Sequence, residues 1–81
     1  MSRETLLKAV NEVFWDVFDD ESLDIREETT AADVNGWDSL RHITLIENIE
    51  DRFDIRFTML EVNGMKNVGE MLDIIAERAR E

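Results

Sequence analysis

The sequence predicts a small all-α protein, a four-helix bundle with three main helices, a short third helix and a long loop between the first two helices. Three observations lead to this class. Apolar residues recur at intervals of three and four over three long segments, which is the period of a helix with one buried face. Two capping signals precede the last two helices. Proline is absent and glycine is scarce, so little in the composition interrupts these segments.

The first helix is expected over residues 3–18. Its apolar positions recur at helical spacing and form a wide stripe: Leu6, Leu7, Val10, Val13, Phe14, Val17 and Phe18. Trp15 falls at the edge of this stripe. The acidic residues at 19–21 end the pattern.

Residues 19–38 show no sustained period and are rich in acids, which predicts a long connection. Leu23, Ile25 and Val34 are spaced apolar residues that can pin this connection to the core, so we expect a packed loop. Loops of this length in small domains are commonly functional. Thr30 is expected to cap a brief helical turn over residues 30–33.

The second helix is expected from Ser39 to Asp54, with Asp38 as its cap. Its period predicts an inward stripe made of Leu40, Ile43, Ile46, Ile49 and Phe53. Leu45 then lies near the outer face, where a partner protein can reach it. Position 40 also suits contact with a partner, and the sequence leaves burial and partner contact equally open for it.

The remaining chain predicts a short third helix and a longer final one. Thr58 and Glu61 have the spacing of a capping box, and Gly64 gives a stop. Asn67 and Glu70 repeat the signal before a helix that runs to about residue 80. Residues 55–57 alternate like a strand but have nothing to pair with. The expected interior is lined by Val10, Phe14, Ile43, Ile46, Ile49 and Leu72.

The charge of the chain limits the kinds of partner that it can bind. Twenty acidic residues against nine Lys and Arg give a net charge of −11. Nucleic acid and anionic membranes are therefore disfavoured, and a basic protein surface is the natural complement. The chain has no cysteine, no apolar signal region and no apolar run long enough to span a membrane. We expect a cytoplasmic protein that is a monomer.

Ser39 follows the acidic loop and directly precedes the apolar period of the second helix, so its hydroxyl is placed at a helix start. Unpaired backbone N–H groups and the positive end of the helix dipole favour a phosphate there. From the residues alone, a capping role for Ser39 is the commoner explanation. A serine that another protein modifies is the alternative, because the chain offers no catalytic apparatus.

Enzymatic and metal-binding readings fit the residues poorly. Asp38, Ser39 and His42 are close in sequence, but a serine nucleophile needs a base that is oriented by a third group, and no nucleophile elbow is present. His42 is instead expected to be an exposed surface residue. The acidic stretches lack the glycine and ligand spacing of an EF-hand, which leaves only weak divalent binding by the loop. We expect no catalytic residue and no specific metal site.

The residues from Asp38-Ser39-Leu40 through the helix that ends Ile49-Glu50-Asp51-Arg52-Phe53, with the following Asp54-Ile55-Arg56-Phe57, closely resemble the acyl carrier proteins. The resemblance covers nearly the whole chain, including the long acidic loop and the short third helix. It implies that residues 1–81 form a single acyl-carrier-like domain.

The resemblance also implies a site and partners. Ser39 would hold 4′-phosphopantetheine, transferred from coenzyme A by a phosphopantetheinyl transferase. The thiol of this arm would carry acyl or aminoacyl groups as thioesters to loading and transfer enzymes with basic docking surfaces. By position, the residues that would contact partners are Asp38, Leu40, Arg41, Glu47, Glu50 and Asp51. The chain itself would catalyse nothing.

Several residues depart from the usual fatty-acid-synthesis pattern of this family. Arg41 and His42 occupy the first turn after the serine, Asn48 replaces a small apolar residue, and Trp37 precedes the motif. The basic pair weakens the local negative patch, or Arg41 contacts the phosphodiester directly. We therefore expect a specialised carrier with short or polar cargo. An unmodified acidic interaction module and a calcium-responsive module remain the alternatives.

Overall fold

The computed structural model describes residues 2–79, which form four α-helices and one short 3-10 turn. The elements are α1 (Arg3–Phe18), η1 (Ala31–Asp33), α2 (Ser39–Phe53), α3 (Met59–Gly64) and α4 (Val68–Arg78). The described residues contain no strand, and residues 55–57 are irregular, so the all-α prediction is confirmed. The helix starts predicted from the caps are also confirmed. Asp38, Thr58 and Asn67 each accept a hydrogen bond from the third residue of their helix.

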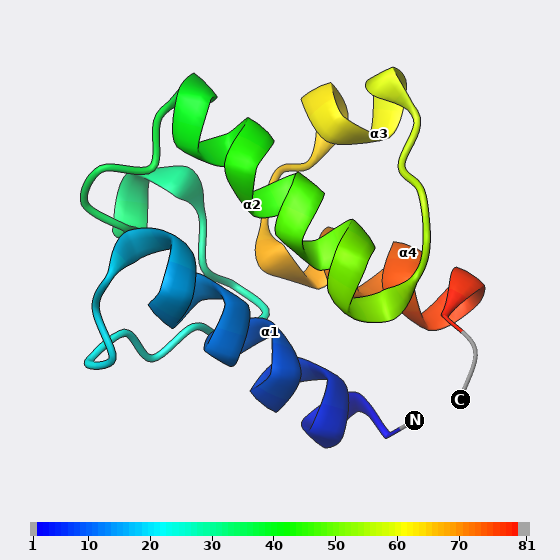
Figure 1. Cartoon of the computed structure of the whole chain (residues 1–81), viewed down its shortest axis with the longest axis horizontal. Helices are drawn as coiled ribbons and strands as arrows, with labels where there is room; N and C mark the ends of the chain where they lie inside the picture. Colours follow the sequence, from blue (N-terminus) through cyan, green and yellow to red (C-terminus); the bar gives the residue numbers. More distant parts are fainter. Residues whose placement is uncertain (1, 80–81) are drawn as a thin grey trace.

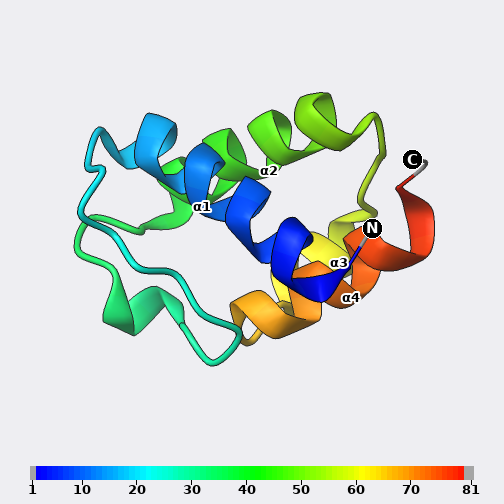
Figure 2. The same cartoon turned by 90° about the horizontal axis from the view of Figure 1, so that it is seen from below.

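Helix α1 packs against both α2 and α4, and in the view of Figure 1 α3 lies on the side of α2 away from α1. The long connection between α1 and α2 passes along one end and one edge of the bundle, where it meets the start of α4 (Figure 2). The short α3 lies beside the first half of α2 and covers less of the bundle than the other helices. The start of α2 is therefore placed between the long loop and α3.

One apolar core joins the three main helices and the loop. Its fully buried members include Leu6, Val10, Phe14, Leu45, Ile49, Val68, Met71, Leu72 and Ile75. Four of the six residues predicted to line the interior lie more than nine-tenths buried on α1 and α2, namely Val10, Phe14, Ile46 and Ile49, and Leu72 joins them from α4. The sixth predicted residue, Ile43, is exposed.

The predicted inward face of α2 is wrong in its first half. Leu40 is 74% exposed and Ile43 is 53% exposed, whereas Leu45 is completely buried. The buried face is Leu45, Ile46, Ile49 and Phe53. The apolar residues of this half cover two overlapping helical faces, and contact with α1 selects the face that includes Leu45.

The long loop is pinned to the core, as predicted. Ile25 and Val34 are buried, and Leu23 is half-buried. Asn11, a buried polar residue of α1, donates to the Ile25 carbonyl at 3.0 Å and accepts from the Ile25 N–H at 2.7 Å. Trp15 at the edge of α1 donates its indole N–H to the Leu23 carbonyl at 2.8 Å. Side chains of α1 thus satisfy the backbone of the loop as well as its apolar residues.

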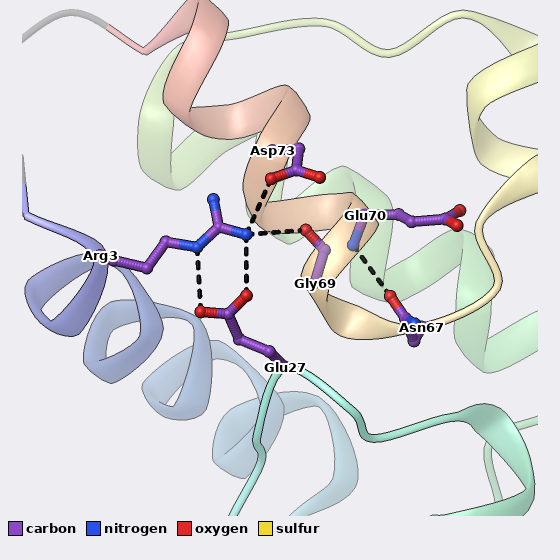
Figure 3. Close-up of polar contacts among 6 residues, drawn as sticks. All are labelled: Arg3, Glu27, Asn67, Gly69, Glu70 and Asp73. Atoms are coloured by element: carbon purple, nitrogen blue, oxygen red, sulfur yellow. Dashed lines mark hydrogen bonds and ion pairs between the residues drawn. The ribbon is translucent and has the colours of Figure 1, made fainter.

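Arg3 joins the loop to α4 at the other end of α1 (Figure 3). Its guanidinium donates to both oxygens of Glu27, to the Gly69 carbonyl and to Asp73. Hydrogen bonds from Arg3 lower the pKa of the Glu27 carboxyl. The N–H of Gly69 also donates to the Glu27 carbonyl at 2.8 Å, and a Cβ on Gly69 would lie 3.1 Å from that oxygen. Glycine permits this close approach of the loop to the first turn of α4.

Helix α3 is held differently, because none of its residues is fully buried. Glu61 forms a two-point ion pair with Arg78 of α4, and Arg78 also donates to the Arg56 carbonyl. The hydrogen bonds from Arg78, together with one from the Thr58 N–H, lower the pKa of Glu61 to about 2. These polar contacts fix α3 to the bundle together with the half-buried Val62, which packs against the core.

Across residues 2–79, no helix combines the length and the apolar character needed to cross a membrane.

Candidate functional site at the start of helix α2

Ser39 is the first residue of α2 and is exposed. Asp38, and not Ser39, caps the helix: its carboxylate accepts from the Arg41 N–H at 2.9 Å, and its carbonyl accepts from the His42 N–H at 2.9 Å. The capping interpretation of Ser39 is therefore wrong. A neighbour performs that task and leaves the serine side chain available.

The groups around the Ser39 hydroxyl are open to a phosphate ester. Within residues 2–79 the hydroxyl has no hydrogen-bond partner, and the N–H groups of Ser39 and Leu40 donate to no protein acceptor. The first N–H groups of a helix carry partial positive charge and bind phosphate oxygens. An attached phosphodiester therefore fits here without displacing any existing hydrogen bond.

A tight turn brings the chain to Ser39. Gly36 has a φ of +86°, a conformation that side chains disfavour, and the Asp38 N–H donates to the Gly36 carbonyl at 3.0 Å. Trp37 then folds back onto α1, with its ring edge-on to Phe14 at 5.3 Å and to Phe18 at 6.4 Å between centroids. This aromatic cluster fixes the loop directly before the serine.

His42 is half-buried and hydrogen-bonded on both sides, so the prediction of an exposed surface residue is wrong. Its Nδ1 lies 3.1 Å from the indole Nε1 of Trp37, and its Nε2 lies 2.9 Å from the Val62 carbonyl of α3. Both ring nitrogens are thus occupied by groups other than Ser39. No serine–histidine pair exists here, and hydrolase chemistry at Ser39 has no base.

Arg41 turns toward α1. Its guanidinium donates to the Val17 carbonyl at 2.9 Å and lies 5.7 Å from the centre of the Phe18 ring. A cation is favoured near a helix C-terminus and over an aromatic face. The guanidinium of Arg41 is therefore bound to the C-terminal end of α1.

A cleft opens beside the serine. It has a volume of about 360 Å³ and is lined by Ala31, Trp37, Asp38, Ser39, His42, Val62, Asn63, Met65, Lys66, Asn67 and Met71. These residues come from η1, the end of the long loop, α2, α3, the connection between α3 and α4, and α4. The lining mixes apolar, amide and charged groups.

The other expected contact residues differ in accessibility. Leu40, Glu47 and Asp51 are exposed on α2. The Glu50 side chain is only 14% exposed and lies 3.6 Å from the Arg56 guanidinium. It also accepts from the Phe57 N–H at 2.8 Å, so this carboxylate fixes the turn after α2. The large exposed apolar side chains are Leu40 and Ile43 of α2 and Met59 and Leu60 of α3.

Among residues 2–79, no three acids or histidines gather as a set of metal ligands. Three acids of the loop instead accept hydrogen bonds from other residues of the chain. Asp20 accepts from the backbone and hydroxyl of Ser22, Glu27 binds Arg3, and Asp33 accepts from the Thr30 N–H that opens η1.

The chain was compared with known protein families, sequences and structures. No protein-family model matches the chain. The acyl carrier protein of Acidothermus cellulolyticus is 29% identical over 76 residues, which cover 94% of this chain and 90% of that protein. The solution NMR structure of the holo acyl carrier protein from Geobacter metallireducens matches with a TM-score of 0.83 at 39% identity, covering 89% of this chain and 83% of that one. The chain belongs to the acyl carrier protein family.

The predicted resemblance and fold are thus confirmed. The carrier holds acyl intermediates on a phosphopantetheine arm, and it is not an enzyme. Its family predicts partners of two kinds, a phosphopantetheinyl transferase and the enzymes of a biosynthetic pathway.

Proposed function

We propose that Ser39 is the residue of this carrier that holds the phosphopantetheine arm. The observation that supports it is the division of labour at the start of α2, where Asp38 caps the helix and the Ser39 hydroxyl stays exposed and unbonded. The unpaired N–H groups of the first turn favour the phosphate of the arm. The arm supplies the thiol that forms thioesters, which the cysteine-free chain lacks.

The test is loading of the intact carrier. The purified chain is incubated with coenzyme A, magnesium and a phosphopantetheinyl transferase of broad specificity, and the intact mass is measured. We expect a gain of one arm, which disappears in Ser39→Ala and persists in Ser22→Ala. No gain with several transferases would favour an unmodified interaction module.

We further propose that partners dock on the exposed surface of α2 and α3 around Ser39. Leu40 offers an apolar side chain, and Glu47 and Asp51 offer exposed acids to a basic partner surface. Asp38, Arg41 and Glu50 contribute less, because their side chains are already bonded within the carrier. Charge reversal at Glu47 or Asp51 is expected to slow partner association several-fold at low salt, and added salt should reduce the difference.

The same surface favours a specialised carrier over one of general fatty acid synthesis. The cleft beside Ser39 is lined by the rings of Trp37 and His42 and by the polar groups of Asn63, Lys66 and Asn67. Such a cleft suits a short or polar acyl group. Loading with acyl chains of increasing length tests this: a long chain that raises the melting temperature markedly would contradict it, whereas short chains are expected to change it little.

A further inference from the structure

His42 joins two parts of the carrier that lie on either side of the cleft. Trp37 Nε1 faces its Nδ1 at 3.1 Å, and the Val62 carbonyl faces its Nε2 at 2.9 Å. An indole N–H only donates and a carbonyl only accepts. The ring therefore holds its proton on Nε2 and leaves Nδ1 as the acceptor.

Both partners of His42 are segments that need such support. Trp37 belongs to the loop that ends at Ser39, and its indole N–H is half-buried against α1 and α2. Val62 belongs to α3, which has no fully buried residue and is otherwise held by the packing of the Val62 side chain against the core and by the Glu61–Arg78 pair with α4. Loss of His42 would remove the hydrogen bond between α3 and the first half of α2.

We propose that His42 is a positioning residue that fixes Trp37 and α3 to one point of α2 and so keeps the two sides of the cleft beside Ser39 in register. The consequence for the arm and its cargo rests on the proposed function. The bridge itself is a property of the unmodified chain, so it stands or falls independently of where the arm is attached.

Two substitutions separate the halves of the bridge. The amide oxygen of His42→Asn takes the place of Nδ1 and can accept from Trp37, but it cannot reach Val62. The amide nitrogen of His42→Gln takes the place of Nε2 and can donate to Val62, but it leaves Trp37 without an acceptor. His42→Phe keeps a ring and removes both hydrogen bonds.

The experiment is ¹⁵N NMR of the unmodified full chain, with the ring nitrogens of His42, the indole N–H of Trp37 and the amides of α3 as readouts. In the wild type near pH 8 we expect the Nε2–H tautomer.

For the variants, hydrogen exchange of the α3 amides should be roughly five-fold faster in His42→Asn and His42→Phe and close to wild type in His42→Gln. The Trp37 indole signal should move in His42→Gln and His42→Phe and stay in place in His42→Asn. An Nδ1–H tautomer in the wild type, or unchanged α3 exchange and indole signal in His42→Phe, would overturn the proposal. If a variant does not fold, the tautomer of His42 in the wild type still decides.

Discussion

Asp38 and Ser39 divide two tasks at the start of α2. The aspartate takes the N-cap, with its carboxylate 2.9 Å from the Arg41 N–H, and the serine hydroxyl is left exposed. The sequence made both residues candidates for the cap, because either side chain can accept from the first turn. The backbone decides: Asp38 is extended and Ser39 is helical, and only the extended residue can reach back to the Arg41 N–H.

The capping role of Asp38 gives a prediction at this scale. Asp38→Ala is expected to lower the free energy of unfolding by about 1 kcal/mol, because one N–H of the first turn loses its acceptor. Asp38→Asn keeps an acceptor and should cost clearly less. Urea unfolding followed by far-UV circular dichroism measures both. An equal loss in the two variants would mean that the charge, and not the cap, is what matters.

Single residues also show where sequence patterns fail. The sequence predicts an exposed His42, but its ring is held by Trp37 of the preceding loop and by Val62 of α3. Asn11 gives no periodic signal, although its amide holds the Ile25 backbone in both directions. Such contacts depend on the tertiary arrangement, and no spacing in the chain encodes them.

At the scale of elements, caps and periods predicted where helices begin and end. α1 spans Arg3–Phe18 and α2 begins at Ser39, as expected, and Thr58 and Asn67 cap α3 and α4. The rotation of α2 could not be predicted. Its apolar residues Leu40, Ile43, Leu45 and Ile46 offer two helical faces of similar apolar content, so the period alone does not choose between them.

Alanine substitutions on the two faces test the observed rotation. Leu45→Ala should lower the free energy of unfolding by about 2–5 kcal/mol, because it opens a cavity in the core. Leu40→Ala should change it by less than about 0.5 kcal/mol, because its side chain is exposed. Chemical denaturation of both variants gives the comparison. Similar losses at the two positions would contradict the rotation described for α2.

The link between α3 and α4 predicts a pH dependence. Glu61 has a pKa of about 2 in the folded protein, against an ordinary value of 4.5, chiefly because Arg78 donates to it. Because the pKa of Glu61 is lower in the folded protein, its ionised carboxylate stabilises the fold at pH values above 4.5. This contribution is lost as the pH falls from 4.5 toward 2. Glu61→Gln should therefore melt below the wild type near neutral pH.

The melting temperatures of wild type and Glu61→Gln are expected to converge as the pH falls through that range. Calorimetry over a pH series measures this convergence. A constant difference between the two proteins at all pH values would show that the Glu61 charge does not contribute to holding α3.

At the scale of the whole molecule, the long acidic loop is part of the bundle. Its apolar anchors could be predicted from spacing, and Ile25 and Val34 are indeed buried. The hydrogen bonds that hold the loop could not be predicted, because Arg3 contacts Glu27, Gly69 and Asp73 at sequence separations of 24, 66 and 70 residues. These groups can pair only because the fold brings the start of α1, the long loop and the start of α4 together.

The net charge of −11 also acts on the whole molecule. Mutual repulsion among the acids opposes the compact state, and salt screens it. We expect the melting temperature to rise when the ionic strength increases from low to physiological values. A fall over this range would indicate that the ion pairs of Arg3 and Arg78 outweigh the repulsion.

Attachment of the arm to Ser39 is tested most directly by locating the modified serine. The carrier is loaded from coenzyme A by a transferase, digested, and its peptides are sequenced by tandem mass spectrometry. The chain has three serines, and we predict that the arm is found on Ser39 alone. An arm on Ser2 or Ser22, or loading that survives in Ser39→Ala, would contradict the role proposed for the start of α2.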